Sequence, residues 1–142
     1  MRLDLVIDTP HPPDRFIAAL TDFSERRPDH WPFLARGSYE VHELGETEAE
    51  VTEGTTSPAG AYWARERYDW SKPGVVSWTV RDSNFCEPGT TIVARVSPRG
   101  EGSRIDLSWE RRPKGWRGAL FMAMMKPFGK AFLRRAYAGV RL

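Results

Sequence analysis

The sequence Leu3-Asp4-Leu5-Val6-Ile7 lies near the start of the chain, and Thr9-Pro10-His11-Pro12-Pro13-Asp14-Arg15-Phe16 follows it. Leucine and isoleucine occupy every second position of the first stretch, which predicts a strand with one buried face. The prolines of the second stretch end this strand, and proline and aspartate are both favoured in the first turn of a helix. We therefore expect a helix over Pro13–Leu20 and a second short helix through Arg26 and Arg27, closed by Pro28 and Pro32.

Six further strands are predicted as an antiparallel meander. Turn signals rich in glycine and proline separate them, such as the hairpin signal Gly45-Glu46. The first strand can add an edge to this sheet, and Gly54–Gly60 is expected to be a mobile loop. The expected strands are Ser38–Leu44, Thr47–Glu53, Ala61–Trp70, Val75–Arg81, Thr90–Ser97 and Arg104–Glu110.

The segment from Trp116 to about Val140 has apolar residues at helical spacing, which predicts a long amphipathic helix. Pro127 lies inside this segment. Because proline removes a backbone hydrogen bond and clashes with the preceding turn, we expect a kink or break there. The apolar side is expected to hold Phe121, Met124, Met125, Phe128, Ala131 and Phe132, and the opposite side Lys126, Lys130, Arg134 and Arg141.

Length and composition indicate one domain over residues 1–142, with no nucleic-acid partner. The chain has 142 residues and a formal net charge of +2, and its charges are interspersed. Its single cysteine, Cys86, cannot form an internal disulfide, and no Cys/His grouping has zinc-ligand spacing, so we expect no metal or cofactor. The first residues lack the positively charged segment followed by a long apolar stretch that is typical of a signal peptide. We therefore expect a cytoplasmic protein.

Strand periodicity places Glu66 among apolar neighbours on the inner face of the sheet, and Glu53 and Glu43 fall there in the same way. A carboxylate in an apolar cavity has a raised pKa, which suits it to acid–base chemistry. Inward carboxylates are nevertheless more often solvated or paired with arginine. His30 is the histidine placed to face a pocket, and Arg135 lies on the apolar side of the final helix. Glu66, His30 and Arg135 are thus the catalytic candidates.

The chain has more bulky apolar side chains than are needed to fill the space between a small sheet and one helix. They either fill the core or line a cavity, since methionine adapts its shape and tryptophan or tyrosine offers a polar group. The pattern leaves both alternatives open. The candidate ligand-binding residues are Trp31, Tyr62, Tyr68, Trp70, Trp78, Trp109, Phe121, Met124, Met125, Phe128 and Phe132.

The chain resembles the START-related superfamily (SRPBCC), which includes polyketide cyclases, lipid-transport proteins and the birch-pollen allergens. The N-terminal stretch carries this resemblance together with Arg27-Pro28-Asp29-His30-Trp31-Pro32. Tyr39-Glu40-Val41-His42-Glu43-Leu44-Gly45, Trp63-Ala64-Arg65-Glu66-Arg67-Tyr68-Asp69-Trp70 and Asp82-Ser83-Asn84-Phe85-Cys86-Glu87-Pro88-Gly89 resemble a small bacterial branch of it. The resemblance implies an α+β helix-grip fold: a seven-stranded antiparallel sheet wrapped around a long C-terminal helix, with two short helices after the first strand.

Three functions are compatible with this resemblance, and no motif selects among them. The first is binding or transport of a hydrophobic or amphipathic small molecule, such as a lipid, polyketide or isoprenoid, between sheet and helix, with transient membrane contact through the basic face of the helix. The second is a polyketide cyclase or dehydratase that uses a pocket carboxylate. The third is an accessory protein whose core is filled.

Overall fold

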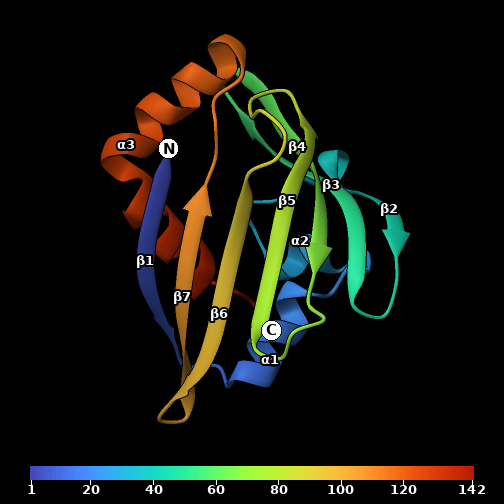
Figure 1. The fold of residues 1–142 in the computed structure, drawn as a ribbon, viewed down its shortest axis with the longest axis vertical. Coiled ribbons are helices and arrows are strands. Elements are labelled where there is room, and N and C mark those ends of the chain that lie inside the picture. Colours follow the sequence, from blue (N-terminus) through green and yellow to red (C-terminus); the bar gives the residue numbers. More distant parts are fainter.

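A computed structural model describes residues 1–142 and shows one seven-stranded antiparallel sheet curved around a long helix (Figure 1). The order across the sheet is β1-β7-β6-β5-β4-β3-β2, so the first strand pairs with the last. The predicted α+β architecture, with the first strand added at an edge, is confirmed. The strands are β1 (Arg2–Thr9), β2 (Glu40–Leu44), β3 (Glu48–Ser57), β4 (Gly60–Asp69), β5 (Val75–Ser83), β6 (Thr91–Arg99) and β7 (Gly102–Glu110).

Two short helices, α1 (Pro13–Leu20) and α2 (Arg27–His30), follow β1, and a short 3-10 turn, η1 (Arg36–Ser38), precedes β2. The bounds predicted for α1 are confirmed. α2 ends at His30, before Pro32, but the prediction that Pro28 closes it is wrong, because α2 begins at Arg27 and holds Pro28 in its first turn. Proline is accepted there, since its missing N–H would have had no partner within the helix.

The predicted loop over Gly54–Gly60 is also wrong. β3 continues to Ser57 and β4 begins at Gly60, and these two residues pair across the hairpin. Pro58 and Ala59 alone make the turn. Gly60 has a φ of +104°, a conformation that a residue with a Cβ rarely adopts.

The inner face of the sheet has the composition that the period-two pattern predicts. Alternate residues of β4 to β7 are buried and form most of the core with Trp31, whose indole N–H donates to the Ala19 carbonyl at 3.1 Å. The buried hydrophobic residues of these four strands are Tyr62, Ala64, Tyr68, Val76, Trp78, Val80, Ile92, Ala94, Val96, Ile105, Leu107 and Trp109.

Helix α3 (Gly115–Ala138) is continuous through Pro127, so no break occurs there. The residues that face the sheet follow a four-residue spacing, with Phe121 half-buried and Met125, Gly129, Leu133 and Tyr137 buried. The apolar side predicted from the sequence is therefore placed wrongly at Met124 and Phe128, which are 56% and 66% exposed.

The first turn of α3 fits closely against the preceding backbone, and Gly118→Ala tests this fit. A Cβ at Gly118 would lie 2.4 Å from the Phe85 carbonyl oxygen and 2.9 Å from the Pro113 backbone. We expect the substitution to lower the free energy of unfolding by about 1–3 kcal/mol, because neither backbone segment can yield cheaply. The control is Gly37→Ala, whose Cβ would meet nothing within 4 Å. Equal urea-unfolding midpoints for the two variants would contradict the close fit.

Candidate functional site

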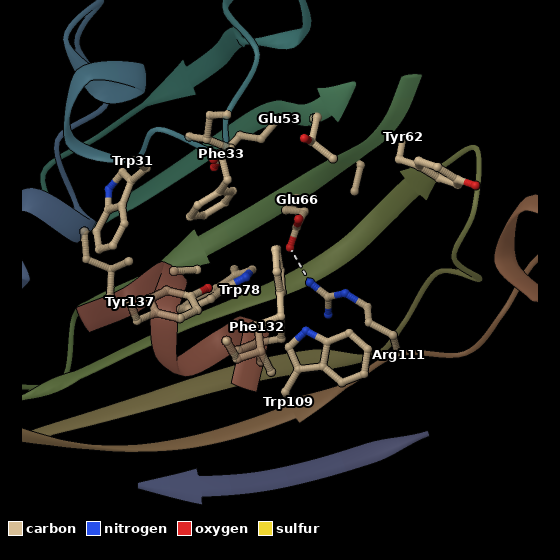
Figure 2. A pocket seen from close by; sticks show the side chains of 18 of the residues that line it. Trp31, Phe33, Glu53, Tyr62, Glu66, Trp78, Trp109, Arg111, Phe132 and Tyr137 are labelled. Carbon is tan, nitrogen blue, oxygen red and sulfur yellow. Dashed lines mark hydrogen bonds and ion pairs between the residues drawn. The ribbon is translucent and has the colours of Figure 1, made fainter. Parts of the chain in front are cut away.

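A cavity of about 160 Å³ lies between the inner face of the sheet and the helices (Figure 2). Sixteen of its 22 lining residues are hydrophobic, and the charged ones are Arg27, Glu53, Glu66 and Arg111. An engineered protein cavity of about 150 Å³ admits benzene. The cavity therefore accommodates one small ring.

Seven of the predicted ligand-binding residues line this cavity. They come from the segment after α2, from strands β4, β5 and β7 and from α3, so residues far apart in the sequence converge on one chamber. Tyr68 and Trp78 are stacked on adjacent strands with ring centroids 5.2 Å apart. The seven residues are Trp31, Tyr62, Tyr68, Trp78, Trp109, Phe121 and Phe132.

The remaining four predicted ligand-binding residues lie outside the cavity wall. Met125 is buried in the core, and half-buried Trp70 packs against Phe23 with ring centroids 5.6 Å apart. Met124 and Phe128 lie on the exposed side of α3. Their placement in the wall is wrong because the buried row of α3 runs through Met125 instead.

Two of the three catalytic candidates are also placed outside the cavity. The ring of His30 is held by Asp22 Oδ2, 2.8 Å from Nε2, and by the Arg141 carbonyl oxygen, 2.6 Å from Nδ1. His30 thereby joins the end of the chain to the segment between α1 and α2. Arg135 is exposed on α3 and makes no ion pair. The expectation that either residue faces a pocket is therefore wrong.

Glu66 faces the cavity, as predicted, and is 8% exposed. Its Oε2 accepts a hydrogen bond from Arg111 Nη2 at 2.7 Å, and Figure 2 shows this pair in the centre of the chamber. Burial raises the pKa of Glu66 to about 7, although the charge of Arg111 opposes the shift. A bulge between β4 and β5 lies beside Glu66. Such bulges commonly redirect side chains next to functional sites.

The raised pKa of Glu66 makes stability pH-dependent. Because the folded protein holds this proton more tightly than the unfolded chain, the stabilisation is fully present below pH 4.5 and is lost as the pH rises through about 7. Glu66→Gln keeps the site neutral. We expect the free energy of unfolding of this variant, minus that of wild type, to increase by on the order of 3 kcal/mol as the pH rises from 4.5 to about 7. Urea denaturation from pH 4 to 8 measures this difference.

The matched control for this experiment is Glu43→Gln on β2. A hydrogen bond from Arg67 lowers the pKa of the exposed Glu43, so removing its charge shifts the pH dependence in the opposite direction. A flat difference between wild type and Glu66→Gln over pH 4–8 would show that folding does not shift the pKa of Glu66.

A second buried ion pair joins Arg27 of α2 to Glu53 of β3, with Nε and Oε2 3.2 Å apart. Arg27 is 2% exposed, and its Nη1 also donates to the carbonyl oxygens of Leu20 at 2.8 Å and Asp22 at 3.1 Å. Its Nη2 reaches the Tyr68 hydroxyl at 3.3 Å. Glu53 Oε1 is buried and has no hydrogen-bond partner. Glu53 thus lines the cavity with one carboxylate oxygen that is enclosed by the protein and lacks a hydrogen-bond partner.

Among the charged and aromatic residues of this site, sequence reasoning missed five: Arg27, Phe33, Phe85, Arg111 and Tyr137. The sequence pattern could have identified two of them. Arg111 continues the alternation of the inward-facing residues of β7, and Tyr137 continues the buried row of α3. Arg27 lies in a polar helix and carried no such signal, and the two phenylalanines lie outside regular elements.

No group of three or more His, Cys, Asp or Glu side chains is arranged to hold a metal ion. None of the helices combines the length and apolar character needed to cross a membrane. Two carboxylates, two guanidinium groups and several aromatic side chains line the cavity.

Fold and cavity define a helix-grip protein with an internal chamber. Over residues 2–141 the sequence matches the family described as polyketide cyclase / dehydrase and lipid transport, and the chain belongs to this family. No curated protein sequence matches the chain.

Solved structures show the same fold at low sequence identity. A START superfamily protein from Mycobacterium smegmatis aligns with a TM-score of 0.77 and 8% identity, over 97% of this chain and 94% of that one. The Zhui aromatase/cyclase from Streptomyces sp. R1128 aligns with a TM-score of 0.72 and 13% identity, over 98% of this chain and 92% of that one. TTHA0849 from Thermus thermophilus aligns with a TM-score of 0.72 and 14% identity, over 97% of this chain and 90% of that one.

Proposed function

We propose that the protein binds a small hydrophobic molecule that carries a hydroxyl or another hydrogen-bond donor, and that it binds this molecule in the cavity between sheet and α3. One observation carries the proposal. The chamber is apolar except for two ion pairs, and Glu53 Oε1 is buried beside it without a hydrogen-bond partner. A ligand donor would satisfy this oxygen, while the aromatic walls would cover the rest of the ligand.

The energetics favour a ligand of this class over a purely apolar one. Burying apolar ligand surface contributes about 25 cal/mol per Å². A hydrogen bond to a charged acceptor adds about 1.5–3 kcal/mol, because an unsatisfied buried carboxylate oxygen is unfavourable. The family description, which names both polyketide cyclases and lipid transport, supports a hydrophobic ligand. A lipid, polyketide or isoprenoid is larger than this volume, so part of such a ligand would extend beyond the cavity.

Two ligands of equal shape test the polar part of this proposal. p-Cresol and p-xylene differ by a hydroxyl in place of a methyl group, and both contain the single ring that the cavity accommodates. We expect p-cresol to bind at least threefold more tightly in isothermal titration calorimetry, because only its hydroxyl can donate to Glu53 Oε1. Equal affinities would contradict a role for Glu53.

A pair of variants locates the binding. Ala136 lines the cavity, whereas Ala131 is exposed on the same helix. Ala136→Leu fills the chamber and is expected to abolish p-cresol binding, while Ala131→Leu adds the same side chain elsewhere and leaves it unchanged. Thermal unfolding of both variants checks that the fold persists. If neither ligand binds wild type, the proposal fails and an accessory protein with a filled core becomes the better account.

A second candidate function is an enzyme of the cyclase or dehydratase kind, favoured by the pairing of Glu66 with Arg111. A carboxylate whose pKa is about 7 is suited to take a proton near neutral pH. In an enolisation, the C–H bond next to a ketone breaks, its proton moves to Glu66 and its electron pair moves to the ketone oxygen. Arg111 would hold the enolate oxygen that develops.

Cyclohexanone tests this chemistry, since it is a single-ring ketone with exchangeable protons beside the carbonyl group. We expect the protein to accelerate hydrogen–deuterium exchange at these carbons, with a rate that rises up to about pH 7 as Glu66 ionises. The rate is followed by proton NMR in D₂O. Glu66→Gln should return it to the buffer value, and the exposed Glu43→Gln should not. Exchange that persists in Glu66→Gln would remove Glu66 from this role.

A further inference from the structure

The cavity reaches the molecular surface at helix α3. Phe132 is the only one of its lining residues that is exposed, at 49%. Solvent reaches Phe33, Leu34 and Thr55 in part, and these residues line the cavity from the segment after α2 and from β3. Because a side chain that lines the chamber and is also exposed stands where the two regions meet, Phe132 marks the opening.

Large apolar side chains continue from Phe132 along the outside of α3. Phe128 and Met124 precede it at intervals of four residues, and residues four apart form one ridge on a helix surface. Their exposed fractions are 66% and 56%. Lys126 lies on the opposite flank of α3, where it lines a surface groove with Leu3 of β1, and does not interrupt this ridge. We call Met124, Phe128 and Phe132 the apolar strip.

Chamber and apolar strip form one continuous apolar surface, because Phe132 belongs to both. Glu53 lies on the sheet and Phe132 on the helix, and Figure 2 shows them on opposite sides of the chamber. A ring whose hydroxyl points to Glu53 therefore directs its para position toward Phe132. A long substituent at that position would leave the chamber along the apolar strip.

We propose that the apolar strip is the outer half of the ligand site, and that the ligand is an elongated amphiphile. Its head is a ring, or a group of similar size, that carries a hydroxyl and occupies the chamber of about 160 Å³. Its tail is an unbranched apolar chain that covers Phe128 and Met124. Exposed apolar patches beside a pocket are typical of ligand-binding surfaces. This inference rests on the proposed function and names the class of ligand that the site takes.

Continuity with the chamber favours a ligand tail over a second copy of the chain as the occupant of the apolar strip. A tail is held at one end by its head and carries no charge. Residues 111–142 contain six arginines and three lysines and no aspartate or glutamate. Two copies packed through α3 would bring these segments together, and like charges repel.

Two phenols with the same head test the apolar strip. 4-Hexylphenol has a tail that is five methylene groups longer than that of p-cresol. A methylene fully removed from water tightens binding about fourfold, so one covered on a single side adds about twofold, and five add about thirtyfold. We therefore expect 4-hexylphenol to bind wild type about thirtyfold more tightly than p-cresol in isothermal titration calorimetry.

Variants of α3 locate the tail. Met124→Ser/Phe128→Ser removes most of the apolar strip and keeps Phe132, which lines the chamber. We expect this variant to bind 4-hexylphenol about tenfold more weakly than wild type and p-cresol equally well. The matched control is Trp116→Ser, which removes a side chain that is 61% exposed and lies about 24 Å from Phe132 along the helix. It should bind both phenols as wild type does.

The outcomes separate this inference from the proposed function. If wild type binds neither phenol, the proposed function fails, and the inference fails with it. Binding of p-cresol without a gain for 4-hexylphenol, or an equal loss in Trp116→Ser, would overturn the inference alone. So would 4-hexylphenol binding that persists in Ala136→Leu, since the apolar strip would then act without the chamber. A dimer in analytical ultracentrifugation that Met124→Ser/Phe128→Ser dissociates would assign the apolar strip to a second copy.

Discussion

The buried guanidinium of Arg27 is the interaction on which the cavity depends. A cation that is 2% exposed is tolerated only where its hydrogen bonds and a counter-charge are supplied. The carbonyl oxygens of Leu20 and Asp22 fix it to the segment after α1, and Glu53 and Tyr68 fix it to β3 and β4. This one side chain therefore holds the short helices against the sheet and closes one side of the chamber. Breaking such a buried pair typically destabilises a protein by about 3–5 kcal/mol.

Arg27 also determines what remains available to a ligand. Its Nε engages only Oε2 of Glu53, which leaves Oε1 buried and unpaired. Arg111, which follows β7, engages one oxygen of Glu66 on the same inner face of the sheet. The interior thus contains fixed polar groups within aromatic walls, and a ligand with a complementary donor would complete them. α3 closes the chamber with one surface and exposes Met124 and Phe128 on another.

The sequence predicted the sheet and its inner face because period two is a local property that each strand displays by itself. Glu66 and Trp78 were identified in this way, and Arg111 could have been identified by the same alternation. The face of α3 was predicted less well, since every side of this helix holds apolar residues and only packing against the sheet distinguishes Met125 from Met124. The partners of Arg27 and Glu53 could not be predicted, because their contact depends on how the short helices fold back onto the sheet.

A crystal structure of the protein with bound p-cresol tests the central claim most directly, because it locates the ring and its hydroxyl together. The account predicts the ring between Trp78 and Trp109, with the phenolic oxygen within hydrogen-bond distance, about 2.5–3.0 Å, of Glu53 Oε1. A ring bound outside the chamber, or a hydroxyl directed away from both carboxylates, would contradict it.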